Sequence, residues 1–184
     1  MKMDEKRSFY DLRDWMELLE SEGHLTKVSL PVHWDQELGA VVRRTYDFYG
    51  DASPALLFDN IIDYPPPGPH KLFVGQFRSY SRISLMLGLD PLNTTRREIV
   101  LTLKSRLKNR IPPMTLKHGP VHEHVETGDG VNVLKFPVPL WNYRDGGRYI
   151  GTMHAVVTKD LDTDWVNLGL YRVMVHNRKE LGIY

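Results

Sequence analysis

The sequence predicts an α+β protein whose first part is rich in helices and whose last part is rich in strands. Amphipathic helical patterns with capping residues precede residue 110, and alternating β-branched stretches follow the Ile111–Pro113 segment. Because two successive prolines suit neither a helix interior nor a central strand, we place a boundary there. The expected domains are a small amino-terminal α/β unit at 1–112 and the opening strands of a barrel or sandwich at 113–184.

The first domain is expected to alternate helices with short strands. Helices are expected at 8–22, 36–49, 81–88 and 95–109, with Ser8, Asp35 and Ser81 as caps and a Thr95–Glu98 capping box. Strands are expected at 24–30, 54–58 and 71–75, and a stiff proline loop at 65–69. In the last helix the expected inward residues are Ile99, Val100, Leu103 and Leu107.

The second domain is expected to contain strands at 131–136, 149–159 and 165–176. A turn at 160–164 joins the last two strands into a hairpin. Asn167 and Arg172 are five residues apart on the final strand, so a regular strand sends them to opposite faces. Two residues that serve one ligand from that spacing need a bulge, for which Gly169 is the natural place. The alternative is that Asn167 faces solvent while Arg172 pairs with a carboxylate.

Composition excludes several classes of protein. The 184 residues are 41% hydrophobic and 26% charged, as in ordinary globular chains, and can bury a sizeable core. The chain has no cysteine, which excludes disulfides, thiolate metal sites and a cysteine nucleophile. No apolar run approaches the roughly 20 residues of a membrane span, and the charged first residues do not resemble a signal peptide. We therefore expect a cytoplasmic protein.

Three weaker features leave alternatives open. The basic helix at 95–109 is either a solvated face or a site for an anion or a nucleic acid. The net charge of +1 and the lack of an aromatic platform argue against nucleic acid as a partner. His118, His122 and His124 are either a surface cluster or part of a metal site, and Gly146-Gly147 is either a plain turn or a phosphate loop.

Two segments carry a resemblance to a known family. DGGRYIGTMHAVVTKD at 145–160 and WVNLGLYRVMVHN at 165–177 resemble the signature region of the UbiD decarboxylases, whose members use prenylated FMN. DLRDWMELLESEGHLTKVSLPV at 11–32 and PALLFDNI at 54–61 resemble that family's opening segments. The resemblance implies that 113–184 begins a split β-barrel, a flavin-reductase-like cofactor-binding domain.

The resemblance also implies roles for six residues. Asn167 corresponds to a ligand of a divalent metal, usually manganese, that bridges to the cofactor phosphate, and a carboxamide oxygen suits such an ion. Arg172 corresponds to a catalytic residue beside the cofactor and the substrate carboxylate, for which a permanently charged bidentate donor is suited. The implied cofactor-binding residues are Thr152, Met153, Gly169, Tyr171 and Arg172. Potassium is a further candidate ion.

The implied activity is decarboxylation, or reversible carboxylation, of aromatic or α,β-unsaturated carboxylic acids. The family's metal-binding His and Glu, its catalytic glutamates and its oligomerisation domain have no counterpart in these 184 residues. A further carboxyl-terminal segment or a second subunit is therefore expected to supply them, within an oligomer, and a flavin prenyltransferase to supply the cofactor. The alternative is a non-catalytic binding or assembly module that retains the strands of the flavin site.

Overall fold

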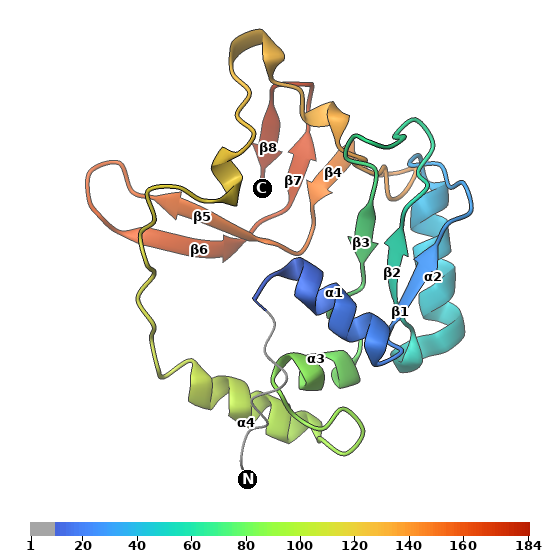
Figure 1. Ribbon diagram of the computed structural model, residues 1–184, viewed down its shortest axis with the longest axis vertical. Helices are drawn as coiled ribbons and strands as arrows, with labels where there is room; N and C mark the ends of the chain where they lie inside the picture. Colours follow the sequence, from blue (N-terminus) through green and yellow to red (C-terminus); the bar gives the residue numbers. More distant parts are fainter. Residues whose placement is uncertain (1–9) are drawn as a thin grey trace. The chain divides into compact units, whose positions relative to one another are not determined.

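The computed structural model describes residues 10–184, which form two compact units. The first unit comprises the described part of Met1–Val28 together with Arg44–Leu57 and Phe73–Val125. The second unit comprises Ser29–Arg43, Phe58–Leu72 and Glu126–Tyr184. Figure 1 shows helices and strands in both parts of the chain, which confirms the α+β class. The predicted division into 1–112 and 113–184 stays a prediction.

The helices and strands follow the order expected from the sequence, with shorter strands. The helices are α1 Leu12–Ser21, α2 Glu37–Tyr49, α3 Tyr80–Met86 and α4 Arg96–Arg106. The strands are β1 Leu25–Val28, β2 Ala55–Phe58, β3 Leu72–Val74, β4 Arg148–Gly151, β5 Ala155–Lys159, β6 Val166–Leu170, β7 Val173–Val175 and β8 Leu181–Ile183. Strands β1, β2 and β3 pair in that order in one sheet. None of the helices in the described part is long and apolar enough to cross a membrane.

The core of the first unit gathers around α1. Trp15 and Leu19 of this helix are at most 2% exposed and pack with Ala55 and Leu85. Asp11 caps the helix by accepting hydrogen bonds from two backbone amides of the first turn. The helix therefore begins later than expected, and the predicted cap Ser8 lies outside the described residues. Gly23, at φ +72°, ends it as expected.

Two other caps of the first unit test the predicted helix starts. The Thr95–Glu98 capping box of α4 is confirmed. The cap of α3 is Ser79 and not Ser81, because the extended backbone of Ser79 lets its hydroxyl accept from the Arg82 amide. The predicted inward stripe of α4 is wrong apart from Ile99, which is 4% exposed. Its other members are 40–77% exposed: Val100, Leu103 and Leu107.

Arg82 is the largest fully buried side chain of the first unit. It is 1% exposed and donates from Nη1 to the carbonyl of Ser53 at 2.6 Å and from Nη2 to that of Gly75 at 2.9 Å. Burial lowers the pKa of the Arg82 guanidinium from its ordinary value. This side chain therefore ties α3 to the segments that begin β2 and follow β3.

We expect Arg82→Met to lower the free energy of unfolding by about 1–3 kcal/mol, because it removes the donor to the buried Ser53 carbonyl and leaves the Gly75 carbonyl with only the Arg78 amide. Arg97→Met is the matched control, since Arg97 is exposed on α4, and its effect should stay within about 0.5 kcal/mol. Urea denaturation measures both. Equal midpoints for the two variants would show that the Arg82 hydrogen bonds add nothing to stability.

The second unit contains a three-stranded sheet and a two-stranded arm. Antiparallel strands pair in the order β4-β7-β8, and β5 pairs with β6 in a separate hairpin, as Figure 1 shows. The two long strands predicted at 149–159 and 165–176 are therefore each broken into two. Strand β8 was not expected. The strand predicted at 131–136 is wrong: Val133–Lys135 forms a 3-10 turn, in which the Asn132 side chain accepts from the Leu134 amide.

Candidate functional site

Four of the six predicted site residues lie where the chain passes between the three-stranded sheet and the β5–β6 hairpin. On this side the three-stranded sheet ends with the pair Gly151 and Val173, and the hairpin begins with the pair Ala155 and Leu170. Three residues on one strand, from Thr152 to His154, thus face two on the other, Tyr171 and Arg172. We call these five residues the strand junction. The unequal count is that of a bulge, which re-aims side chains.

The strand junction accounts for the odd spacing of Asn167 and Arg172. The ladder between β5 and β6 is regular through Gly169, so the bulge predicted there is absent. The irregularity comes at Tyr171 and Arg172, which have no partner on β5, and the Arg172 backbone pairs instead with Tyr184 next to the β7–β8 ladder. The Arg172 side chain therefore does not follow the alternation of β6. This is the condition under which Asn167 and Arg172 could serve one ligand in spite of their odd spacing. Whether the two residues serve one ligand stays a prediction.

The two faces of β6 differ in character. Asn167 and Gly169 lie on one face and are half-buried, while Val166, Leu168 and Leu170 lie on the other and are exposed. Asn167 pairs across the hairpin with Thr158, and its carboxamide makes no hydrogen bond within residues 10–184. The carboxamide oxygen is thus available to a ligand.

Gly169 has a packing reason to lack a side chain. A Cβ placed on it would lie 2.3 Å from Cε2 of Tyr171, so the tyrosine ring folds back over the glycine. Because that Cβ would point to the same face as the Asn167 side chain, the Tyr171 ring and the carboxamide share the half-buried face. Two predicted cofactor-binding residues are thus brought together beside the predicted metal ligand.

The Arg172 guanidinium is held against an aromatic ring, and its charge is not paired with a carboxylate of the described residues. The backbone of Arg172 exchanges two hydrogen bonds with Tyr184, at 3.2 and 3.0 Å, and its Cζ lies 4.7 Å from the centre of the Tyr184 ring. No carboxylate of the described residues forms an ion pair with it. The alternative in which Arg172 pairs with a carboxylate of this part of the chain is therefore not observed.

His154 is a residue of the strand junction that the sequence did not single out. A Cβ on Gly151 would lie 1.9 Å from Cε1 of His154, so the imidazole sits directly against the glycine backbone. The Nδ1 atom of this ring is buried and has no hydrogen-bond partner among residues 10–184. The position next to Thr152 and Met153 was the only sequence signal that could have drawn attention to it.

Arg148, at the start of β4, was also missed. Its Cζ lies 3.9 Å from the centre of the Trp34 ring, Nε donates to the carbonyl of Val138 at 2.7 Å, and Nη2 donates to the Tyr64 hydroxyl. These contacts fix the strand that leads to Thr152. Arg148 therefore positions β4. Its place in the DGGR segment gave no sign that it would contact aromatic residues as distant in sequence as Trp34 and Tyr64.

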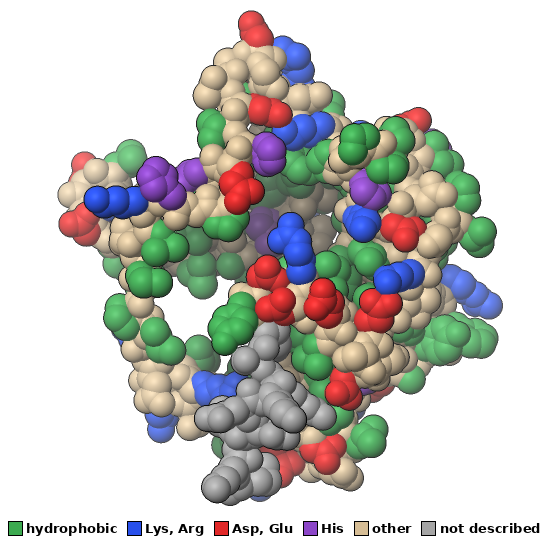
Figure 2. All heavy atoms as spheres, viewed as in Figure 1, with side chains coloured by type: hydrophobic (Ala, Val, Ile, Leu, Met, Phe, Trp, Pro, Cys, Tyr) green, Lys and Arg blue, Asp and Glu red, His purple; other side chains and the backbone are tan. Residues whose placement is uncertain are grey.

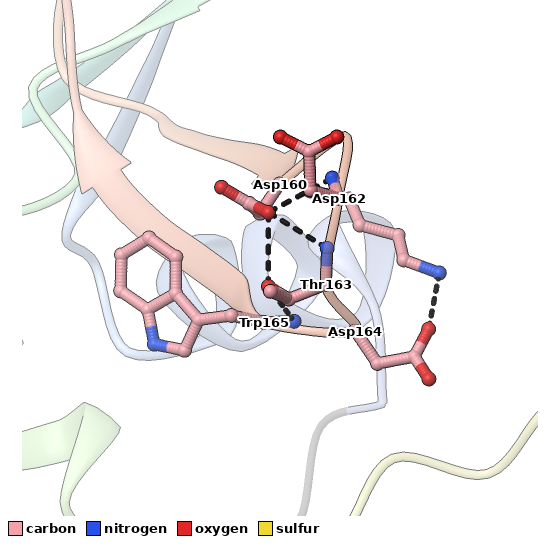
Figure 3. A network of polar contacts seen from close by, with 6 residues as sticks. Asp160, Asp162, Thr163, Asp164 and Trp165 are labelled. Carbon is pink, nitrogen blue, oxygen red and sulfur yellow. Dashed lines mark hydrogen bonds and ion pairs between the residues drawn. The ribbon is translucent and has the colours of Figure 1, made fainter.

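The acidic turn of the hairpin is a structural feature and not a metal site. Figure 3 shows one carboxylate oxygen of Asp160 accepting from the amides of Asp162 and Thr163 and from the Thr163 hydroxyl, at 2.8–3.0 Å. The Thr163 hydroxyl bond and these amide bonds lower the pKa of the Asp160 carboxyl below its ordinary value. Lys159 donates to Asp164 at 2.8 Å across the same turn. The predicted hairpin is thus confirmed, with its acids used to close it.

The other candidate sites, a histidine cluster and an apolar pocket, have weaker support. No group of three or more His, Cys, Asp or Glu residues within 10–184 is arranged to hold a metal ion. His118, His122 and His124 therefore do not form a metal site by themselves. An apolar pocket of about 240 Å³ lies in the second unit between Lys71–Leu72, Phe136–Pro139 and Tyr149–Ile150. None of the predicted site residues lines this pocket.

Two family profiles match the chain in succession. The 3-octaprenyl-4-hydroxybenzoate carboxy-lyase N-terminal domain matches residues 16–99, and the Rift-related domain of the same carboxy-lyase family matches residues 114–184. The chain belongs to the UbiD family. The strand junction and both faces of β6 lie within the second match.

Relatives agree with this membership of the UbiD family. The chain is 36% identical over 181 residues to pyrrole-2-carboxylic acid decarboxylase of Pseudomonas aeruginosa, covering 95% of this chain and 36% of that protein. It is 33% identical over 184 residues to phenolic acid decarboxylase of Sedimentibacter hydroxybenzoicus, covering 95% of this chain and 36% of the relative. The chain therefore spans little more than a third of the length of these relatives.

Solved structures show the same fold. Vanillic acid decarboxylase (ShVdcCD) of Sedimentibacter hydroxybenzoicus, in its closed form, superposes with a TM-score of 0.83 at 30% identity, covering 96% of this chain and 37% of that one. The UbiD-class enzyme HmfF of Pelotomaculum thermopropionicum, solved in complex with prFMN, is similar in fold, with a TM-score of 0.77 at 22% identity over 94% of this chain and 38% of that one.

Proposed function

We propose that this chain is the amino-terminal part of a prenylated-FMN-dependent decarboxylase, or reversible carboxylase, of aromatic or α,β-unsaturated carboxylic acids. The observation that carries the proposal is the strand junction, which gathers Thr152, Met153, Tyr171 and Arg172 in a chain of the UbiD family. Relatives that decarboxylate pyrrole-2-carboxylic, ferulic and phenolic acids support this class of substrate. The neighbour solved with prFMN supports the cofactor.

In this proposal Arg172 holds the substrate carboxylate. Its guanidinium stacks on the Tyr184 ring, which leaves its N–H groups at the ring edge free to donate. A carboxylate can accept two parallel hydrogen bonds from such a group, which fixes its orientation as well as its position. Thr152 and Met153, both exposed at the strand junction, and the Tyr171 ring over Gly169 would form one wall of the cofactor site.

Asn167 would contribute one oxygen ligand to a manganese ion beside the cofactor phosphate. The free carboxamide on the half-buried face of β6 suits a hard cation. No group of three or more His, Cys, Asp or Glu residues within 10–184 is arranged to hold a metal ion, and in this proposal the remaining polypeptide supplies further ligands. Potassium would be a second ion of the same site.

The bound prenylated FMN would supply the electron sink for loss of CO2, while this chain orients the substrate and the cofactor. A glutamic acid from a further carboxyl-terminal segment or from a second subunit would deliver the proton. Vanillic acid decarboxylase, solved together with ShVdcD, is a neighbour in which a second chain is present. A flavin prenyltransferase would provide the cofactor, and the enzyme would be a cytoplasmic oligomer.

The proposal is tested by assembling the chain with the remaining polypeptide in cells that contain a flavin prenyltransferase. We expect flavin absorption in the purified protein and CO2 release from at least one aromatic or α,β-unsaturated acid. The alternative is a non-catalytic assembly module, and in its favour no group of three or more His, Cys, Asp or Glu residues within 10–184 could hold a metal ion. Such a module predicts no flavin absorption even after the partner is added.

We expect Asn167→Ala to lower the manganese content of the assembled enzyme at least about tenfold, because the ion loses one of its few protein ligands. Metal analysis after gel filtration measures this. Asn109→Ala is the matched control, since the Asn109 side chain is exposed in the turn that follows α4 and its loss should leave the metal content unchanged. Equal manganese in the two variants would remove Asn167 from the metal site.

A further inference from the structure

One face of the β5–β6 hairpin is apolar, apart from Lys159 beside the turn, and is uncovered. The exposed fractions are 66% for Val157, 55% for Val166, 68% for Leu168 and 69% for Leu170, and Ala155 beside them is also exposed. We call these five residues the hairpin face. Cross-strand partners on it are Ala155 with Leu170 and Val157 with Leu168, so the side chains form one continuous surface. Figure 2 shows hydrophobic side chains at the surface of this arm, next to the charged groups of its turn.

This surface differs from a random scatter of exposed apolar residues. Single exposed leucines are common, but this face carries five adjacent apolar residues, and its one charged residue, Lys159, lies at the turn end and pairs with Asp164 at 2.8 Å. A continuous exposed apolar surface of this kind is an interaction surface or an aggregation hazard. A two-stranded hairpin is also marginally stable by itself and needs packing on one face. The opposite face, which carries Asn167 and Gly169, is only half-buried, so it does not supply that packing in full.

We propose that the hairpin face is the binding surface for the polypeptide that completes the enzyme. This inference rests on the proposed function, in which a further segment or second subunit supplies the catalytic glutamates. About a third of each relative's length is matched by this chain, and the hairpin lies within the matched Rift-related domain. The occupant is therefore the part of a UbiD-type polypeptide that corresponds to the unmatched length, with an apolar surface complementary to valine and leucine.

The two faces of the hairpin would then have separate tasks. The half-buried face presents Asn167 to the cofactor site, and the hairpin face receives the covering polypeptide. Because both faces belong to the same two strands, seating the polypeptide on one face would hold Asn167 and the strand junction in place on the other. Completion of the fold and formation of the site would thus be coupled through one hairpin.

The absence of cysteine from the chain allows a direct test by thiol labelling. Leu168→Cys places a thiol on the hairpin face, and Leu161→Cys places one on the turn of the same hairpin, where the leucine is 99% exposed. In the assembled enzyme we expect a maleimide to modify Leu168→Cys at least about 100-fold more slowly than Leu161→Cys. Mass spectrometry of the labelled peptides separates these sites from any thiols of the added polypeptide.

The outcomes separate the possible occupants. Labelling of the two positions within about threefold in the assembled enzyme would overturn the inference. Protection of Leu168→Cys in the chain alone that rises with protein concentration would assign the face to a second copy and would also overturn it. Because labelling does not require turnover, protection in an enzyme that releases no CO2 would keep the surface and reject the proposed activity.

Discussion

Replacing Arg172 with alanine is expected to lower kcat/KM for decarboxylation by about 10²–10³-fold, the loss typical of removing one group that stabilises charge in an active site. The guanidinium is exposed, stacks on Tyr184 and has no acidic partner in the described chain, so the folded state loses little with it. CO2 release by the assembled enzyme measures the loss. Arg172→Lys should recover only part of it, because an ammonium keeps the charge without the bidentate geometry.

Arg178→Ala is the matched control for Arg172. Arg178 is also an exposed arginine of the second unit, but its guanidinium lies 3.9 Å from Asp129 in a surface ion pair. Such pairs contribute about 0–1 kcal/mol, so activity and stability should stay close to those of the unchanged enzyme. Equal activities for the Arg172 and Arg178 variants would exclude a catalytic role for Arg172, even if the enzyme binds flavin.

Local signals in the sequence located most of the helices and strands. The Thr95–Glu98 capping box and the glycine after α1 were confirmed because each acts within one turn of its own helix. The cap of α3 was placed two residues late, since Ser79 and Ser81 are equally good caps by residue type. Only the backbone conformation, extended at Ser79, distinguishes them.

The strand breaks could not be predicted from periodicity. Alternation continues through Tyr171 and Arg172, so the sequence predicted one strand from 165 to 176. The break arises because β7 pairs with β4 and β8, while β6 pairs only with β5. Such partner choice is a long-range property that a window of residues does not contain. The resemblance to a family, and not the spacing, directed attention to the residues that meet at this break.

Gly39 was passed over by the sequence analysis because a glycine inside a helix suggests only a small loss of stability. In the structure, α2 lies so close to the Trp141 segment that a Cβ on Gly39 would be 2.1 Å from the Trp141 carbonyl oxygen. Two hydrogen bonds next to this contact hold the two segments together, from the Gln36 amide to the Leu140 carbonyl at 2.8 Å and from the Leu140 amide to the Trp34 carbonyl at 3.1 Å. Neither backbone can withdraw without breaking them.

Gly39→Ala is therefore expected to lower the free energy of unfolding by about 2–3 kcal/mol, although alanine in a helix is intrinsically favoured over glycine by about 1 kcal/mol. Gly119→Ala is the control, because its Cβ would meet nothing within 4 Å and its φ of −156° suits alanine. That variant should stay within about 0.5 kcal/mol in urea denaturation. A Gly39→Ala protein more stable than the unchanged chain would mean that helix propensity outweighs the contact, and that the Trp141 segment, which leads through Gly146 and Gly147 into β4 and the strand junction, is not held by α2.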